Sequence, residues 1–339
     1  MAMIKQRLAI SSALLAAGLF LGSLTPAYAS PSLSDVRAQI TQLQMEAAAA
    51  AEAGQQAQVE LGRLTRSLNS VKQQDSQQAA SLTALKKSIG AIANQQYQNN
   101  GIGEGLSLLF SANPTLYLQA AGSLSVVTTK KVKQLARYTT AEQRLRATSL
   151  TLNDQLALVV AAKAKYAKQE ALAQNKLAQA QSLFAKLTKE QRDALAKLQA
   201  NQDSADQAAS LALAGLGAKV SGRAGIAIRY ALKQLGHSYR FGAAGIVYWD
   251  CSGLTMQAFR AAGVALPHSA AAQSSYGKFV PLNKLLPGDL VFFGRPISHV
   301  GIYYGDGRML DAPHTGARVR IESFSSYFGR EKFVAARRF

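Results

Sequence analysis

The sequence has only one cysteine, Cys251, among its 339 residues. A single cysteine excludes an internal disulfide, so the chain carries a free thiol. Acidic residues are also scarce, because 19 Asp and Glu stand against 38 Lys and Arg and leave a formal net charge of +19. A basic surface of this kind attracts polyanions such as nucleic acid, anionic lipid or an acidic cell wall. The charge by itself selects none of these partners.

Long apolar runs are rare, and the one that stands out lies near the N-terminus. Lys5 and Arg7 precede an apolar run from Leu8 to Leu24, and the small-x-small pattern Ala27-Tyr28-Ala29 follows it. This order predicts a secretory signal peptide over residues 1–29. The run is short for a bilayer span, so an uncleaved membrane anchor is the weaker alternative. Export predicts a secreted protein in the cell wall or a periplasm-like space, and it argues against a nucleic-acid partner.

Proline is absent from residues 33–98, which are rich in Ala, Gln and Leu. Their apolar positions alternate at spacings of three and four, as a coiled coil requires, and a second such register runs from about 124 to 200. We therefore expect an antiparallel coiled-coil helical hairpin over residues 30–200, with its tip at about 99–123. Heptads alone leave open an intermolecular coiled coil. Residues 201–222 are rich in Ala, Ser and Gly with little periodicity, which favours a linker, partly helical.

The pattern changes in residues 223–339. A helical segment at 223–235 is followed by a Gly-rich stretch and by a short helix that starts at Cys251. Five further segments have strand patterns: 289–293, 299–304, 308–311, 317–321 and 333–338. About 117 residues are enough for one small α+β domain.

Cys251 lies in the string Trp249-Asp250-Cys251-Ser252-Gly253-Leu254, between a Gly-rich turn and an apolar helical pattern. A cysteine at a helix N-terminus faces unpaired backbone N–H groups and the positive end of the helix dipole, and both stabilise the thiolate. Asp250 or Ser252 could cap this helix. A lone cysteine is often only a small buried apolar residue. In an exported protein, however, a retained free thiol favours a nucleophile.

A thiol nucleophile needs a base, and His299 starts a predicted core strand. Asp311 lies on the next predicted strand, across the turn Gly305-Asp306-Gly307, so an antiparallel hairpin can bring the two side chains together. A carboxylate in this place would orient the imidazole and favour its protonated form. His314, in a predicted turn, is the alternative third member of a triad. We expect His314 and His237 to be exposed or groove residues.

Five strings of this region occur in the order typical of one family. They are Tyr239-Arg240-Phe241-Gly242, Asp250-Cys251-Ser252-Gly253-Leu254, Leu266-Pro267-His268-Ser269, Pro287-Gly288-Asp289-Leu290-Val291-Phe292-Phe293 and His299-Val300-Gly301-Ile302-Tyr303. Through them, residues 223–339 resemble the NlpC/p60 family of cell-wall cysteine peptidases. The resemblance implies a papain-like α+β fold.

The resemblance also implies roles for single residues. Cys251 matches the family's nucleophile, His299 its base and Asp311 the third, polar member of its triad. Tyr239 matches a tyrosine whose hydroxyl helps to hold the oxyanion, together with the backbone N–H of Cys251. Ser252 matches a substrate contact, and His268 stands where many relatives have Arg and could line the substrate cleft. No cluster has metal-ligand spacing and no phosphate-binding motif is present, so we expect neither metal nor cofactor.

The implied activity is hydrolysis of amide bonds in peptidoglycan stem peptides, most often the γ-D-glutamyl bond to meso-diaminopimelate, in wall remodelling or division. Residues 33–200 resemble, more loosely, coiled-coil domains of wall hydrolases that restrain the enzyme and receive a signal from an FtsEX-type membrane complex. The length of the hairpin and the short linker lead us to expect autoinhibition. The alternatives are a non-catalytic wall-binding scaffold, and an amidase or acyl transferase on the same fold.

Overall fold

The structure is a computed structural model, and it describes residues 32–98, 114–217, 220–325 and 332–339. The expected signal peptide, residues 1–29, lies outside the described residues. None of the helices in the described ranges combines the length and the apolar character that crossing a membrane requires.

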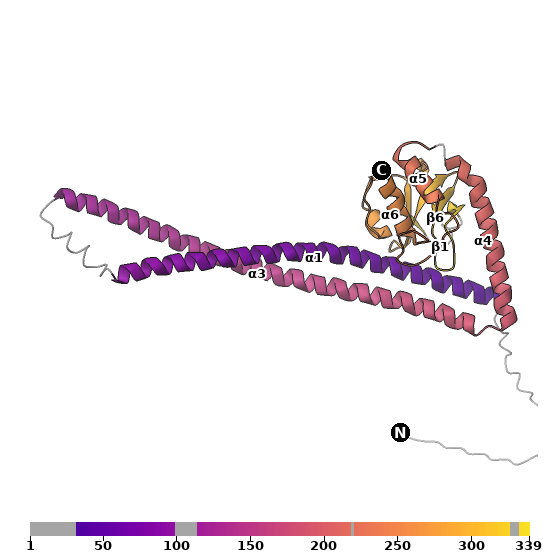
Figure 1. The fold of residues 1–339 in the computed structure, drawn as a ribbon, viewed down its shortest axis with the longest axis horizontal. Helices are drawn as coiled ribbons and strands as arrows, with labels where there is room; N and C mark the ends of the chain where they lie inside the picture. Colours follow the sequence, from indigo (N-terminus) through magenta and orange to yellow (C-terminus); the bar gives the residue numbers. More distant parts are fainter. Residues whose placement is uncertain (1–31, 99–113, 218–219, 326–331) are drawn as a thin grey trace, which may run out of the picture.

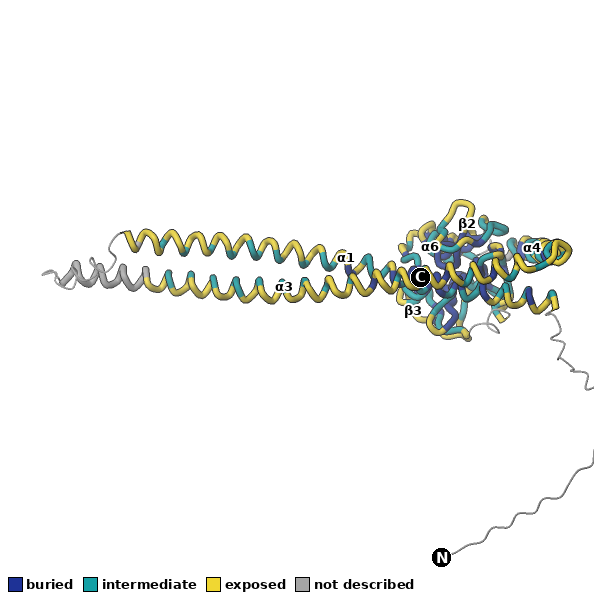
Figure 2. The backbone as a smooth tube through the Cα atoms, turned by 90° about the horizontal axis from the view of Figure 1, so that it is seen from below, coloured by how far each residue is buried: buried dark blue, intermediate teal, exposed yellow. Residues whose placement is uncertain are grey.

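The N-terminal region is a two-helix hairpin. Helix α1 (Leu33–Gln98) and helix α3 (Pro114–Ala185) lie side by side and run antiparallel (Figures 1 and 2). One of the two apolar series of α1 is buried between them along its first half: Val36, Leu43, Ala50, Ala57 and Leu64. The heptads therefore serve packing within one chain.

The second arm starts earlier than the sequence pattern suggested. Helix α3 begins at Pro114, inside the expected tip at 99–123. Proline fits the first turn of a helix because the missing N–H has no intrahelical partner there. The rest of the tip, residues 99–113, lies outside the described residues.

The prediction that the second arm runs to residue 200 is wrong. Helix α3 ends at Ala185, and after a short turn helix α4 (Lys189–Gly217) leaves in a new direction (Figure 1). Thr188 and Gln191 form a capping box at this point, since Gln191 N donates to Thr188 Oγ1 at 3.2 Å and Thr188 N donates to Gln191 Oε1 at 2.9 Å. This motif starts a new helix although the apolar spacing continues.

Residues 201–217, expected as a partly helical linker, are helical throughout and pack on the C-terminal domain. Ile321 N donates to Ser210 Oγ at 2.9 Å, and Tyr304 OH donates to Leu213 O at 2.7 Å. Arg320 forms an ion pair with Asp206 at 3.1 Å. Because these contacts are polar, they left no apolar periodicity in the sequence. Helix α4 is therefore a structural part of the domain rather than a slack connection.

The C-terminal domain is α+β, with a six-stranded antiparallel sheet in the order β3-β8-β4-β5-β6-β7. The strands are β3 (Lys278–Phe279), β4 (Leu290–Phe293), β5 (His299–Gly305), β6 (Arg308–Asp311), β7 (Arg320–Ser323) and β8 (Phe333–Arg338). The predicted strands match five of these, with β7 shifted toward the C-terminus.

Helices α5 (Gly222–Leu232) and α6 (Cys251–Ala261) pack together and cover one face of the sheet (Figure 1). The buried core between them and the sheet includes Ile228, Leu254, Phe259, Leu290, Ile302 and Leu310. The described part of the domain also has four short elements: α7 (Ala270–Gln273), the 3-10 turn η1 (Leu282–Lys284), and the parallel pair β1 (Ser238–Tyr239) and β2 (Tyr248–Trp249). The core thus fixes the start of α6 against the start of β5.

Candidate active site

Cys251 is the first residue of α6, and the chain around it is fixed by a side-chain cap. Asp250 is in an extended conformation and its Oδ1 accepts a hydrogen bond from Gly253 N at 2.7 Å. Of the two capping residues considered from the sequence, Asp250 therefore caps the helix. Cys251 is buried, and the backbone N–H of Val300, the residue after His299, acts to lower the pKa of its thiol. The thiol consequently lies against β5, next to His299.

His299 and Asp311 form the contact that the hairpin topology predicted. His299 Nε2 lies 2.9 Å from Asp311 Oδ2, and both side chains are almost completely buried. The close approach of the two strands depends on Gly301, because a Cβ there would lie 3.4 Å from Asp311 Cβ and 3.0 Å from Met309 Sδ. The carboxylate holds the imidazole in one orientation.

Of the two histidines that we expected to be exposed or groove residues, only His314 departs from the expectation. His314 is buried rather than exposed, and its Nδ1 lies 2.9 Å from the carbonyl oxygen of Thr315. His237 is half-buried and its Nδ1 accepts a hydrogen bond from Trp249 Nε1 at 3.2 Å. The described contacts thus give His299 the partner Asp311, in preference to His314.

Tyr239 and His268 both lie close to the nucleophile segment. Tyr239, at the end of β1, is buried in the same core cluster as Cys251. His268 Nε2 lies 2.9 Å and 3.0 Å from the two carboxylate oxygens of Asp250. Burial alone would lower the pKa of His268, but the hydrogen bond and the charge of Asp250 outweigh it and raise the pKa. His268 thus pairs with the cap of α6.

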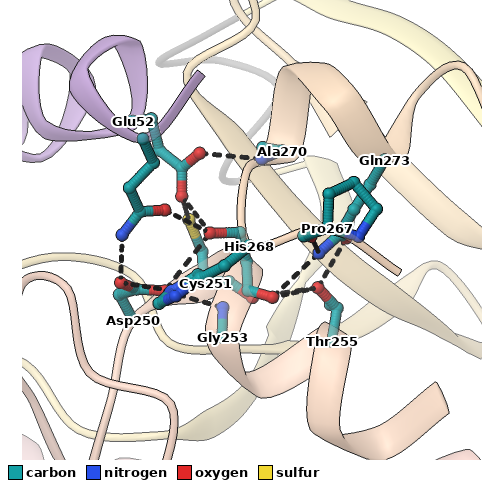
Figure 3. Close-up of polar contacts among 11 residues, drawn as sticks. Glu52, Asp250, Cys251, Gly253, Thr255, Pro267, His268, Ala270 and Gln273 are labelled. Carbon is teal, nitrogen blue, oxygen red and sulfur yellow. Dashed lines mark hydrogen bonds and ion pairs between the residues drawn. The ribbon is translucent and has the colours of Figure 1, made fainter. Parts of the chain in front are cut away.

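Helix α1 of the hairpin enters this site, which no local motif indicated (Figure 3). Glu52 Oε1 accepts a hydrogen bond from Cys251 Sγ at 3.1 Å and is in hydrogen-bond contact with Ser252 Oγ. Glu52 Oε2 accepts one from Ala270 N at 2.8 Å. The Glu52 side chain therefore occupies the space directly in front of the thiol.

Two glutamines on the same face of α1 add to the contact, at the i+3 and i+4 positions from Glu52. Gln55 Nε2 donates to Asp250 Oδ2 at 2.7 Å, and Gln55 Oε1 accepts from Ser252 Oγ at 2.8 Å. Gln56 Oε1 accepts from Ser269 Oγ at 2.9 Å. One helical face thus satisfies polar groups on both sides of the nucleophile.

A run of alanines lets α1 approach the domain closely. Ala47, Ala50 and Ala51 are buried, and Ala50 and Ala51 form a cluster with Ala173 of α3, against which Phe241 of the domain packs. Ala48 belongs to the core cluster of the domain itself. Alanines at consecutive positions make all faces of this part of α1 apolar. A helix with this property is usually buried on more than one face. The alanine run was the signal in the sequence that could have indicated a second packing partner.

The charges at this contact work against the nucleophile. Burial and the negative charge of Asp250 raise the pKa of Glu52 to about 7. Burial, followed by the charges of Glu52 and Asp250, raises the pKa of the Cys251 thiol well above its ordinary value, although the Val300 N–H opposes this. The helix N-terminus was expected to favour thiolate. With α1 seated, burial and two carboxylates outweigh that effect and keep the thiol protonated.

Comparison with known proteins identifies a family match for the C-terminal domain. The model of the NlpC/P60 family matches residues 236–338. "Probable endopeptidase Rv2190c" of Mycobacterium tuberculosis is 44% identical over 99 residues, 29% of this chain and 26% of that protein. "Peptidoglycan endopeptidase RipA" of the same organism is 37% identical over 108 residues, 28% of this chain and 23% of that protein.

Among solved structures, that of NlpC2 from Trichomonas vaginalis matches with 28% identity and a TM-score of 0.33, covering 36% of this chain and 48% of that one. The chain spans about a quarter of the length of the curated relatives it matches. Residues 236–338 are an NlpC/P60 family domain, preceded in this chain by the helices α1, α3 and α4.

Proposed function

We propose that this chain is a cysteine endopeptidase that hydrolyses stem peptides of peptidoglycan, with Cys251 as its nucleophile. The observation that carries the proposal is the position of Cys251 at the start of α6, which packs against β5 where the buried His299–Asp311 pair lies. A buried Asp–His pair next to a thiol is the arrangement of a nucleophile with an oriented base. The endopeptidase names of the relatives support the same class of reaction.

In the proposed mechanism, the imidazole of His299 takes the thiol proton, and the Cys251 thiolate attacks the scissile carbonyl carbon. Because Nε2 of His299 is bonded to Asp311, Nδ1 is the nitrogen that exchanges the proton. The backbone N–H of Cys251 and the hydroxyl of Tyr239 stabilise the oxyanion. The imidazolium then protonates the leaving amine, and a water molecule deprotonated by His299 hydrolyses the thioester.

The finer points of the proposal come from the family resemblance. The bond is the γ-D-glutamyl amide to meso-diaminopimelate, the protein is exported by residues 1–29, and it serves wall remodelling or division. Ser252 and His268 contact the substrate. An FtsEX-type membrane complex acting on the hairpin stays a prediction.

We further propose that the described arrangement is an autoinhibited state. Helix α1 fills the space in front of Cys251 with Glu52, Gln55 and Gln56. A stem peptide must present an extended amide to the thiol, whereas the backbone of α1 is bonded within its own helix. The helix therefore covers the thiol without offering a bond to cut, and the enzyme acts only after α1 has moved away.

Digestion of defined muropeptides with identification of the products by mass spectrometry tests the proposal. The full chain and its Cys251→Ala variant are compared. We expect slow release of stem-peptide fragments by the full chain, from the fraction of molecules in which α1 has moved away, and none by the Cys251→Ala variant. Equal product from both would remove the cysteine mechanism and favour a non-catalytic wall-binding protein. Release of whole stem peptides from the sugar would indicate an amidase.

A further inference from the structure

The hydroxyl of Ser252 lies among more oxygen acceptors than it has protons. Its Oγ is in hydrogen-bond contact with Glu52 Oε1, with Gln55 Oε1 at 2.8 Å and with Asp250 Oδ1 at 3.3 Å. A hydroxyl carries one proton and can donate to only one of them. The other oxygen atoms then face Ser252 Oγ without a proton between them and are repelled by it. The short contact with Glu52 is attractive only if a second proton lies between the two oxygen atoms.

The orientation of Gln55 shows where the second proton is placed. Gln55 Nε2 donates to Asp250 Oδ2 at 2.7 Å, so the amide oxygen faces Ser252. The opposite orientation would set the amide oxygen against a carboxylate oxygen with no proton between them. Ser252 therefore donates to Gln55, and the short contact between Ser252 Oγ and Glu52 Oε1 is filled when Glu52 donates.

The surroundings of Glu52 favour the neutral carboxyl group. Glu52 is buried, and the groups in contact with its carboxyl oxygens, the Cys251 thiol, the Ser252 hydroxyl and the Ala270 N–H, carry no positive charge. The ionisable groups that face it from the domain are Asp250, Cys251 and His268. A protonated His268 pairs with Asp250 rather than with Glu52. A second buried anion beside Asp250 is costly, so protonation of Glu52 relieves the repulsion.

Among the residues of the hairpin that the structure describes, no Lys or Arg is bonded to Glu52. On α3, the backbone of Glu170 lies opposite Gly54. Lys176 of α3 is bonded to Glu46, at 2.7 Å, about one and a half turns away along α1. Burial first, and then the charge of Asp250, accordingly raise the pKa of Glu52 to about 7.

We propose that Glu52 is a proton-sensitive latch: it carries a proton while α1 is seated in the active site and loses it to solvent when α1 leaves. The closed state thus takes up a proton that the open state releases at neutral pH. Acid holds the hairpin closed, and a rise in pH toward neutrality favours its release from Cys251.

The direction follows from proton linkage. In the open state Glu52 faces water and titrates near the ordinary value of 4.5, whereas in the closed state the pKa is about 7. Below pH 4.5 both states are protonated and the full stabilisation of the closed state is present. Between these two values closure weakens about tenfold per pH unit, and above pH 7 it changes no further. The whole window amounts to a change of roughly 300-fold in the closure equilibrium.

The test compares the full chain with Glu52→Gln and with the matched control Glu46→Gln. A Gln at 52 keeps a donor for Ser252 Oγ and an acceptor for Ala270 N, and thus imitates the protonated carboxyl at every pH. Glu46 lies on the same helix, is half-exposed, and its pKa is lowered by its hydrogen bond to Lys176. The readout is the rate at which iodoacetamide alkylates Cys251, the only cysteine, from pH 5 to 8.5.

The wild-type rate is divided by the Glu52→Gln rate at each pH, so that ionisation of the thiol itself cancels. We expect this ratio to rise with pH by on the order of 10²-fold and to level off above pH 7, while Glu46→Gln follows the wild type. A ratio that is constant over the whole pH range would overturn the latch. So would a Glu46→Gln variant whose alkylation rate departs from the wild-type rate in the same way as that of Glu52→Gln. The latch rests on the autoinhibited state proposed above, but alkylation needs no peptide hydrolysis. A failed latch is therefore distinguishable from a failed peptidase assignment.

Discussion

Glu52 accepts a hydrogen bond from the thiol of Cys251 at 3.1 Å, although 199 positions separate the two residues in the sequence. This contact joins the helical hairpin to the candidate nucleophile directly. It blocks the thiol and buries it, and burial is the main reason that the pKa of Cys251 is raised. A protonated Glu52 thus inhibits by covering the thiol, and an ionised Glu52 would disfavour the thiolate further.

Overpacking the contact should release α1. Ala48 is buried in the core cluster of the domain, so Ala48→Trp cannot be accommodated with α1 seated. Overpacking costs about 1–3 kcal/mol, which shifts the closure equilibrium by roughly 5- to 150-fold. Hydrogen exchange at Ala270 measures the shift, because its N–H is bonded to Glu52 when α1 is seated. Ala80→Trp, at an exposed position of the same helix, is the control. Equal exchange in the two variants would show that Ala48 does not hold the contact.

Asp311→Asn should leave the fold intact and remove most of the activity. The amide can still bond His299, but it fixes the wrong tautomer and cannot stabilise the imidazolium. We expect kcat to fall by about 10²- to 10⁴-fold with a smaller change in KM. The comparison is made in the Ala48→Trp background, where the site is open. An unchanged kcat would mean that another group orients His299.

Gly253→Ala should destabilise the domain at the nucleophile itself. A Cβ on Gly253 would lie 2.4 Å from the carbonyl oxygen of Ala243 and 3.0 Å from Ala244 Cα, so backbone must move. We expect a loss of about 1–3 kcal/mol, visible as a lower Tm. The matched change Gly90→Ala meets nothing within 4 Å in the exposed distal part of α1. It should be neutral or stabilising by up to about 1 kcal/mol.

Helix α4 should be required for a stable domain. A fragment of residues 189–339 retains the bonds of Ser210 to Ile321 N and of Tyr304 OH to Leu213 O, whereas a fragment of residues 223–339 loses both. Each lost hydrogen bond at a buried group costs about 1–3 kcal/mol. Thermal unfolding should therefore give a clearly lower Tm for the shorter fragment. Equal Tm values would mean that α4 is only a connection.

Local patterns in the sequence predicted the elements that depend on local chemistry. Heptad spacing indicated two long helices, and alternation with turn residues indicated most strands of the sheet. The contact of His299 with Asp311 followed from hairpin geometry around Gly305-Asp306-Gly307. Two strands joined by a short turn pair with each other, so residues at similar distances from the turn come close together in space.

The remaining features depend on contacts between segments far apart in the chain. The turn before α4 was misassigned because apolar spacing continued through it, although the capping box at Thr188 and Gln191 was present in the sequence. The insertion of Glu52 could not be predicted from any motif, since its partners come from other elements. Only the alanine run around it, apolar on all faces of the helix, hinted at a second partner.

The most direct test of a Cys251 peptidase restrained by α1 is the rate at which a defined stem peptide is hydrolysed by the wild type, by Ala48→Trp and by Ala48→Trp combined with Cys251→Ala. We predict slow hydrolysis by the wild type, at least about fivefold faster hydrolysis when α1 is displaced, and none without the thiol. Equal rates for the wild type and Ala48→Trp, or hydrolysis that persists without Cys251, would contradict the account.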